Sequence, residues 1–358
     1  MQFDKRLTRL RRALAREKVD AILVSDLTNI CYLTGFRGSF AVLLATPTES
    51  VFFTDFRYIE IARKTVSADD IVKTSRDHLE DVKREVRKRK IRRLGFESRA
   101  FSHANYAEFA GKVGEKGLVP LKDTLEKLRD IKEDGEISLI RKAVKLTESA
   151  LRHIRRFFEL GVSEKDLAIE LEVFFKVNGG GESDFRPIVA FGKSSSMPHY
   201  VSSTRKLRNS DMVLIDLGTS LDGYHADLTR TWLSATMKDK EKEIYTIVLD
   251  AQQAAIDRVK PGVRLASIDG AARELISKSG YGENFGHGLG HGIGLKVHEL
   301  PRISAQSEDV CRKGMVFTIE PGIYIPGWGG VRIEDDVLVT ENGCEVLSSF
   351  PKVPRPFT

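Results

Sequence analysis

The sequence predicts two domains, an α/β domain over residues 1–130 and an α+β domain over residues 131–358. Its length of 358 residues exceeds what a typical single hydrophobic core supports. The pattern also changes near residue 130, from short apolar segments alternating with helices to long helices followed by strand hairpins. With 41% hydrophobic and 30% charged residues, the composition is that of an ordinary globular protein.

The first domain is expected to alternate amphipathic helices with short apolar strands, as an α/β unit does. A tight hairpin turn at Pro47–Glu49 joins two of the strands. The predicted elements, in order, are a helix over 5–18, strands over 21–25, 41–46 and 50–55, a helix from about residue 58, a basic helix near residue 85, and strands over 92–97 and 118–121.

The second domain is predicted to begin with a long helix from Asp134, which Gly161 ends. Ser163 then caps a second helix that stops at the run Asn178–Gly181. A strand in DFRPIVAFG and a loop carrying His199 follow. Two strand hairpins complete the domain, separated by helices over about residues 239–259 and 265–279.

The chain shows no sign of export or membrane insertion. No apolar run approaches the 18 or so residues of a membrane span. The amino terminus is charged throughout and lacks the apolar core of a signal peptide. The three cysteines, Cys31, Cys311 and Cys344, are widely spaced. We therefore expect a cytoplasmic protein with no structural disulfide and no membrane partner.

The formal charge of +6 raises the question of nucleic-acid binding, because residues 83–93 (KREVRKRKIRR) concentrate Lys and Arg. No aromatic residues interleave with these charges, as stacking on single strands requires. No nucleic-acid-binding motif accompanies them. We interpret the segment as a solvated helix face and expect no nucleic-acid partner.

Three of the eight histidines fall in GHGLGHGIGLKVHELP, residues 286–301. The spacing of His287 and His291 resembles the zinc-binding helix of metalloproteases, but glycine occupies every second position. Each glycine costs a helix about 1 kcal/mol, so an extended segment is favoured. The two histidines would then lie about 13 Å apart. They cannot bind one ion together, and further ligands must come from elsewhere.

Two acidic hairpins can supply those ligands. In DMVLIDLGTSLDGYHADLTRTWL, a turn over Ser220–Gly223 would set Asp216 directly opposite Asp227, and another even register would make them diagonal neighbours. Opposed Cβ atoms lie about 5 Å apart, which suits carboxylates that bind one ion or a pair of ions.

The same construction recurs in MVFTIEPGIYIPGWGGVRIEDDVLV, where Glu320 and Glu334 lie on paired strands and Arg332 shares the face of Glu334. The second domain is thus a weak internal repeat of helices followed by an acidic hairpin. Four carboxylates gathered without cations would be costly, so the set predicts a metal site.

These segments resemble those of a known family, the pita-bread metallopeptidases, which include methionine aminopeptidase, prolidase and aminopeptidase P. The resemblance rests on LIDLG, ADLTRT, GHGLGHGIG, TIEPG and GGVRIEDD. The phrases YLTGFRGS and TDFRYIEIA are typical of the creatinase/prolidase amino-terminal domain, so the resemblance covers nearly the whole chain and favours the proline-directed branch. It implies a pita-bread catalytic domain with a pseudo-twofold internal repeat.

The resemblance also implies the roles of individual residues. The metal ligands would be Asp216, Asp227, His291, Glu320 and Glu334. They would hold two divalent ions, Mn²⁺ or Co²⁺ in the first place, with Zn²⁺ or Fe²⁺ as alternatives. The catalytic residues would be Glu320 as a proton shuttle, His199 and His298 as donors to the substrate, and Arg332, which would orient Glu334 and the bound peptide. The substrate residues would be Phe185 as a wall of the proline pocket, His287 in the pocket lining, and Arg302.

The expected function is hydrolysis of the peptide bond between an amino-terminal residue and proline, by a homodimer acting on di- or oligopeptides. Arg302 lies where some prolidases bind a dipeptide carboxylate, which slightly favours a dipeptidase over an aminopeptidase. Two alternatives share the fold. Metal-free creatine amidinohydrolase does not keep the ligand set, and non-catalytic binding relatives lose the acids; here all five ligand types are present.

Overall fold

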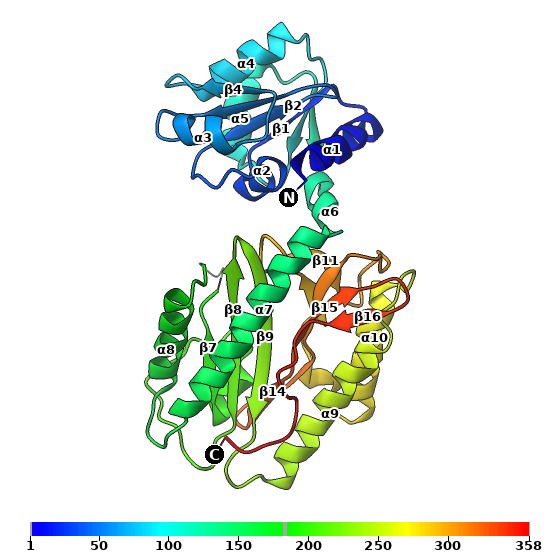
Figure 1. Ribbon diagram of the computed structural model, residues 1–358. Coiled ribbons are helices and arrows are strands. Elements are labelled where there is room, and N and C mark those ends of the chain that lie inside the picture. Colours follow the sequence, from blue (N-terminus) through cyan, green and yellow to red (C-terminus); the bar gives the residue numbers. More distant parts are fainter. Residues whose placement is uncertain (1, 182–184, 358) are drawn as a thin grey trace. The chain divides into compact units, whose positions relative to one another are not determined.

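The computed structural model describes residues 2–181 and 185–357. The chain divides into two compact units, with the boundary between Arg129 and Asp130 (Figure 1). Along the part of the chain that is described, no helix is long and apolar enough to cross a membrane.

The first unit is built on a six-stranded sheet with the order β4-β3-β2-β1-β5-β6. Strands β1, β2 and β3 pair antiparallel, whereas β4, β5 and β6 join in parallel. The strands are β1 Ala21–Val24, β2 Val42–Ala45, β3 Ser50–Thr54, β4 Asp70–Lys73, β5 Leu94–Glu97 and β6 Leu118–Leu121. The mixed sheet with helices confirms the α/β class of the amino-terminal part.

Six helices accompany this sheet, and three of them were not predicted. The short helices α2 and α6 and the weakly amphipathic α5 have no long apolar stripe that a sequence pattern could detect. The helices are α1 Phe3–Glu17, α2 Leu27–Thr34, α3 Ile59–Thr65, α4 His78–Lys88, α5 His103–Val113 and α6 Thr124–Arg129.

The basic segment 83–93 covers the end of α4 and the turn that follows it. Its charges have local partners: Arg84 pairs with Asp81, and Arg89 pairs with Glu49. This arrangement supports the interpretation of a solvated helix face.

The second unit repeats one arrangement twice, namely two helices followed by strands. Figure 1 shows α7 lying across β8 and β9. The helical elements are α7 Asp134–Ile154, η1 Arg155–Phe157, α8 Glu164–Val177, η2 Gly192–Ser196, α9 Asp239–Ile256, α10 Leu265–Lys278 and η3 Gly282–Asn284. The strands are β7 Ile188–Phe191, β8 Val213–Leu221, β9 Tyr224–Trp232, β10 Gly290–Gly292, β11 Glu299–Ile303, β12 Val316–Ile319, β13 Gly322–Ile325, β14 Gly329–Arg332, β15 Asp335–Val339 and β16 Cys344–Val346.

Three sheets carry these strands, with the orders β7-β8-β9, β11-β10-β12-β15-β16 and β13-β14. One apolar cluster packs α7 and α8 against β7, β8 and β9, and a second packs α9 and α10 against β12, β13 and β15. The two halves therefore have similar layers, as the internal repeat predicted.

Two predicted elements have different limits. The long helix ends at Ile154 and a 3₁₀ turn follows it, whereas the sequence predicted a helix to Gly161. Gly161 donates its N–H to Leu207 O, so the chain has already left the helix to reach another segment. Strand β7 covers Ile188–Phe191 only. The first residue of the predicted strand, Asp184, lies outside the described residues. Ser163 caps α8 through its hydroxyl, as predicted.

Candidate metal centre

The first acidic hairpin differs from the predicted register. A two-residue turn, Asp222–Gly223, joins β8 to β9, and both residues have positive φ (48° and 74°), as this turn type requires. Asp227 is therefore opposite Gly218, and Asp216 is opposite Thr229. Of the two even registers that the sequence left open, the directly opposed one is not formed; Asp216 and Asp227 are diagonal neighbours on one face of the sheet.

The second acidic hairpin brings Glu320 and Glu334 together. Strands β12 and β15 pair Ile319 with Asp335, and β13 and β14 pair Gly322 with Arg332. Both ladders follow one register, which sets Glu320 opposite Glu334 in the short gap between them.

His291 reaches the site from β10, which is shorter than the extended segment that the glycine pattern predicted. Strand β10 lies between β11 and β12 and packs closely against both. A Cβ on Gly290 would lie 2.0 Å from Thr318 O, and one on Gly292 would lie 2.0 Å from Leu300 O. Glycine is therefore required by close approach of the neighbouring backbones.

The five candidate ligands converge from these three segments. His291 Nε2 lies 3.3 Å from Glu320 Oε1 and 3.8 Å from Asp227 Oδ2. One donor atom each from Asp227, His291 and Glu334 lies within 4.8 Å of the others. Asp216 is tied to the group by Arg332, whose Nη2 is 2.5 Å from its Oδ2.

The electrostatics of the cluster follow from burial and mutual repulsion. Burial and the charges of Glu334 and Asp216 raise the pKa of Asp227 well above its ordinary value. Burial and the charge of Glu320 do the same to the pKa of Glu334. Burial opposes ionisation of Glu320 too, but the hydrogen bond from His291 and the charge of that ring outweigh it and lower its pKa to about 2. The protein alone cannot keep all the acids ionised.

A cation fits this cluster better than protons do. Oδ1 of Asp216, Oδ1 of Asp227 and Oε1 of Glu334 are buried and have no hydrogen-bond partner among the described residues. Buried acceptors are normally paired, and unpaired ones need an explanation such as an ion. Carboxylates with one imidazole suit divalent metals, and no cysteine lies among these ligands to indicate a structural zinc site.

Arg332 is the centre of a hydrogen-bond network that the sequence only partly predicted. It donates to Asp216, to Thr229 Oγ1 and to Tyr324 Oη. Thr229 in turn donates to Glu334. The hydroxyl of Thr229 thus stands between Arg332 and Glu334, and the expectation that Arg332 orients Glu334 stays a prediction.

Other residues at the site carried no recognisable signal in the sequence. Tyr324 Oη lies 3.0 Å from His287 Nε2, so His287 belongs to the edge of the Arg332 network. Asp336 accepts the backbone N–H of Asp227, and burial raises its pKa to about 8. In the sequence, only the closeness of Tyr324 to Glu320 and of Asp336 to Glu334 could have indicated that these two residues belong to the site.

The remaining histidines lie beside the carboxylates. The rings of His291 and His298 are 4.2 Å apart. Both His298 and His199 are exposed, and His199 is near enough to lower the pKa of His298, although burial has the larger effect.

The loop that carries His298 is held by two buried contacts. Gly294 O accepts the N–H of His225 and lies 3.1 Å from its Nδ1. Glu299, directly after His298, forms an ion pair with Lys132 at 2.9 Å. A Cβ on Gly294 would lie 2.3 Å from Glu299 Oε1, which shows how closely the loop is packed.

Two candidate substrate residues border the same cluster. The ring of Phe185 is 3.2 Å from the position that a Cβ on Gly218 would take, so it lies against β8 next to Asp216 and Asp227. Arg302 pairs with His291 across β10 and β11 and is exposed. Paired residues share a face, so Arg302 is beside the metal-binding histidine candidate.

Comparisons with known proteins place most of the chain in two known domain families. Residues 138–341 match metallopeptidase family M24, and residues 6–131 match the creatinase/prolidase amino-terminal domain. The chain is similar to the Xaa-Pro dipeptidase of Pyrococcus horikoshii, with 34% identity over 97% of each chain.

Solved structures are similar over nearly the same length. An Xaa-Pro dipeptidase from Bacillus anthracis has a TM-score of 0.96 and 38% identity and matches 99% of both chains. An X-Pro aminopeptidase from Thermotoga maritima has a TM-score of 0.88 and 33% identity and matches 96% of this chain and 99% of its own.

Proposed function

Because the chain belongs to metallopeptidase family M24 and has the pita-bread catalytic fold with a creatinase/prolidase amino-terminal domain, we propose that it hydrolyses the bond between an amino-terminal residue and proline. The observation that carries the proposal is the buried cluster of four acids and His291, with three carboxylate oxygens that have no partner among the described residues. The names of the relatives support proline-directed specificity.

The ligands that we propose are Asp216, Asp227, His291, Glu320 and Glu334. They carry enough negative charge to bind two divalent ions; we propose Mn²⁺ or Co²⁺ first and Zn²⁺ or Fe²⁺ as alternatives, since the ligand types alone do not choose among them. When bound, such ions lower the pKa of a water molecule and polarise the scissile carbonyl.

The protein's own residues would perform the other tasks. Glu320 has a lowered pKa, so it is ionised at neutral pH. As the proposed proton shuttle it would take the proton of the attacking water and pass it to the leaving amine. His199 and His298 would donate hydrogen bonds to the substrate as charge develops on its oxygen. Arg332, Tyr324 and Thr229 would fix the acids in place.

The substrate would be bounded by residues next to the cluster. Phe185 offers an apolar wall for the proline ring. Arg302, exposed beside His291, offers a guanidinium to a free carboxylate that directly follows proline. This placement favours a dipeptidase over an aminopeptidase. The homodimer and the cytoplasmic location also remain proposals, and light scattering tests the first of them.

The direct test is hydrolysis of Ala-Pro compared with Ala-Ala by the purified, metal-loaded protein. The proposal expects release of proline and slow or no cleavage of Ala-Ala. Efficient cleavage of Ala-Ala with no preference for proline would contradict the proposed specificity, and the protein would then be a metallopeptidase of different specificity.

A further inference from the structure

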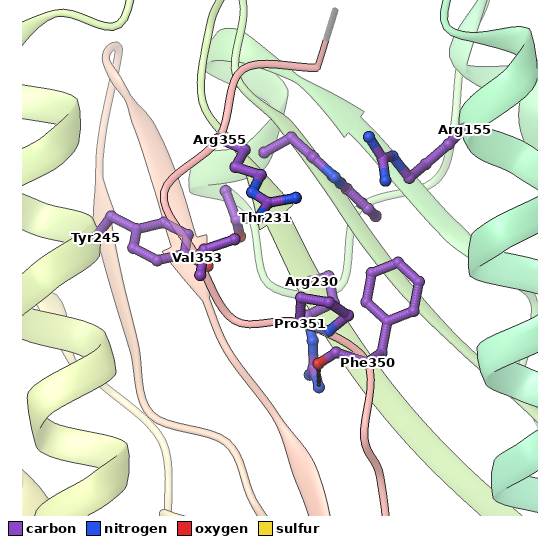
Figure 2. A pocket seen from close by; sticks show the side chains of 9 residues that line it. Arg155, Arg230, Thr231, Tyr245, Phe350, Pro351, Val353 and Arg355 are labelled. Atoms are coloured by element: carbon purple, nitrogen blue, oxygen red, sulfur yellow. Dashed lines mark hydrogen bonds between the residues drawn. The ribbon is translucent and has the colours of Figure 1, made fainter.

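A second, arginine-rich cavity lies apart from the metal cluster, where the carboxy-terminal segment covers β9 (Figure 2). The empty space there is about 340 Å³, a figure that includes open solvent and is not an enclosed volume. Arg155, Arg230 and Arg355 line it, together with Thr231, Tyr245 and apolar side chains. None of the residues that line it is acidic.

The cavity is separated from the metal ligands by the strand itself. Side chains alternate along a strand, so Arg230 and Trp232 point away from the face that carries Asp227 and Thr229. A molecule in the cavity would therefore not contact the acidic cluster directly.

Arg230 is buried and fixed before any ligand arrives. Its Nη1 donates to Thr229 O, and its Nη2 donates to Asp335 Oδ1 at 2.7 Å and to Phe350 O. Its Nε is also buried, yet it has no hydrogen-bond partner among the described residues. A buried donor without an acceptor is costly, and an acceptor in the cavity would remove that cost.

The other two arginines are exposed at the cavity. Neither Arg155 nor Arg355 forms an ion pair with any residue that the structure describes. The hydroxyl of Tyr245 likewise has no partner there, and burial raises its pKa to about 12, so it remains a donor at neutral pH. Arg230 is paired with Asp335, but its Nε, the two exposed arginines and the hydroxyl of Tyr245 have no acceptor among the described residues.

We propose that this cavity is a binding site for a small tetrahedral oxyanion of the phosphate type, held by Arg155, Arg230 and Arg355. The planar guanidinium group matches such oxyanions with paired, charge-assisted hydrogen bonds. The anion would be inorganic phosphate itself or the phosphate group of a small organic molecule, since both present the same oxygens.

The test is calorimetric titration of the metal-loaded protein with inorganic phosphate and with phosphoserine. The variant is Arg155→Gln combined with Arg355→Gln, which changes two exposed side chains and leaves the buried Arg230 intact. The control is Arg156→Gln, which removes one exposed positive charge next to Arg155 but outside the cavity lining. Phosphate binding at the metal centre should be the same in the wild type, the double variant and the control, so it cancels when their binding isotherms are compared.

The proposal expects the double variant to bind the anion at least about tenfold more weakly than the wild type, a difference of about 1.4 kcal/mol. The control should bind as the wild type does. Tighter binding of phosphoserine than of phosphate, lost in the double variant, would also support the site and identify an organic ligand. Should the double variant be poorly folded, Arg355→Gln alone serves in its place.

Crystals soaked in selenate locate the anion independently. Anomalous density between the three arginines supports the site. Equal phosphate affinity in the wild type and the double variant overturns the proposal. Selenate found only at the metal centre or between neighbouring molecules would be an adventitious ion only, and this result also overturns the proposal.

Discussion

Lys132 and Glu299 form an ion pair of 2.9 Å in which both side chains are almost completely buried, with exposures of 1% and 4%. Glu299 directly follows His298, the exposed histidine beside His291. The pair thus connects the segment before α7 to the loop that presents a proposed substrate-binding side chain.

Replacing Lys132 by Met should therefore affect both stability and turnover. Removing the buried ammonium group that pairs with Glu299 should cost about 3–5 kcal/mol of unfolding free energy. Movement of His298 should lower kcat by up to about 10²-fold with unchanged metal content. Denaturant unfolding, metal analysis and Ala-Pro kinetics measure these effects.

Two further variants separate positioning from stability. The double variant Lys132→Met, Glu299→Gln should regain much of the stability but not the turnover. Lys313→Met, which removes an exposed ion pair with Glu341, should change neither. Recovery of full kcat in the double variant would show that the pair acts only on stability.

The histidines should differ in what their loss removes. His291→Ala should lose metal, because its ring lies among the acids, 3.3 Å from Glu320. His199→Ala and His298→Ala should keep metal and lose about 10²–10³-fold in kcat, as donors to a developing oxyanion do. His287→Ala should be milder, since His287 contacts Tyr324 at the edge of the network. Loss of metal from His287→Ala but not from His291→Ala would contradict this assignment.

Arg302 should decide the preferred substrate length. If it binds the carboxylate that follows proline, Ala-Pro should be cleaved at least about tenfold better than Ala-Pro-Ala, in line with a charge-assisted bond of about 1.5–3 kcal/mol. Arg302→Ala should abolish this preference without loss of metal. A wild type that prefers the tripeptide would instead be an aminopeptidase.

Stabilisation by metal should increase with pH. The pKa values of Asp227 and Glu334 are raised well above normal and that of Asp336 is raised to about 8, so the folded, metal-free protein holds these protons more tightly than the unfolded chain does. Stability from these groups is present at low pH and is lost as pH rises through the raised pKa values.

Bound cations should cancel that loss by neutralising the ionised acids. The difference in Tm between Mn²⁺-loaded and chelator-treated protein should therefore be larger at pH 8 than at pH 5.5. Comparison at each pH removes contributions from groups away from the site. A difference that shrinks as pH rises would contradict the electrostatic account of the cluster.

The sequence could predict the fold class and the candidate ligands because both depend on strong local patterns. Hairpin pairing brings Asp216 near Asp227 and sets Glu320 opposite Glu334. The two hairpins meet each other through the tertiary fold. The sequence left two registers of the first hairpin open, because a turn of two residues and a turn of four residues are both even. Only the positive φ of Asp222 and Gly223 distinguishes them.

The rest depends on contacts between distant segments. Lys132 contacts Glu299, and Arg230 contacts the carboxy-terminal segment, only because the tertiary fold brings them together. The residues next to them in the sequence do not indicate either contact. Thr229 and Tyr324 are common residue types whose importance comes from bonding to Arg332. No periodicity marks such residues before the fold is known.

The central claim is that the buried acids and His291 bind the metal on which peptide hydrolysis depends. The most direct measurement is metal content together with Ala-Pro hydrolysis before chelation, after chelation and after Mn²⁺ is restored, for the wild type and for Asp227→Asn. The account predicts that hydrolysis disappears with the metal and returns with it in the wild type, and that Asp227→Asn neither holds the full metal content nor recovers activity. Full hydrolysis by a sample verified as metal-free would contradict it.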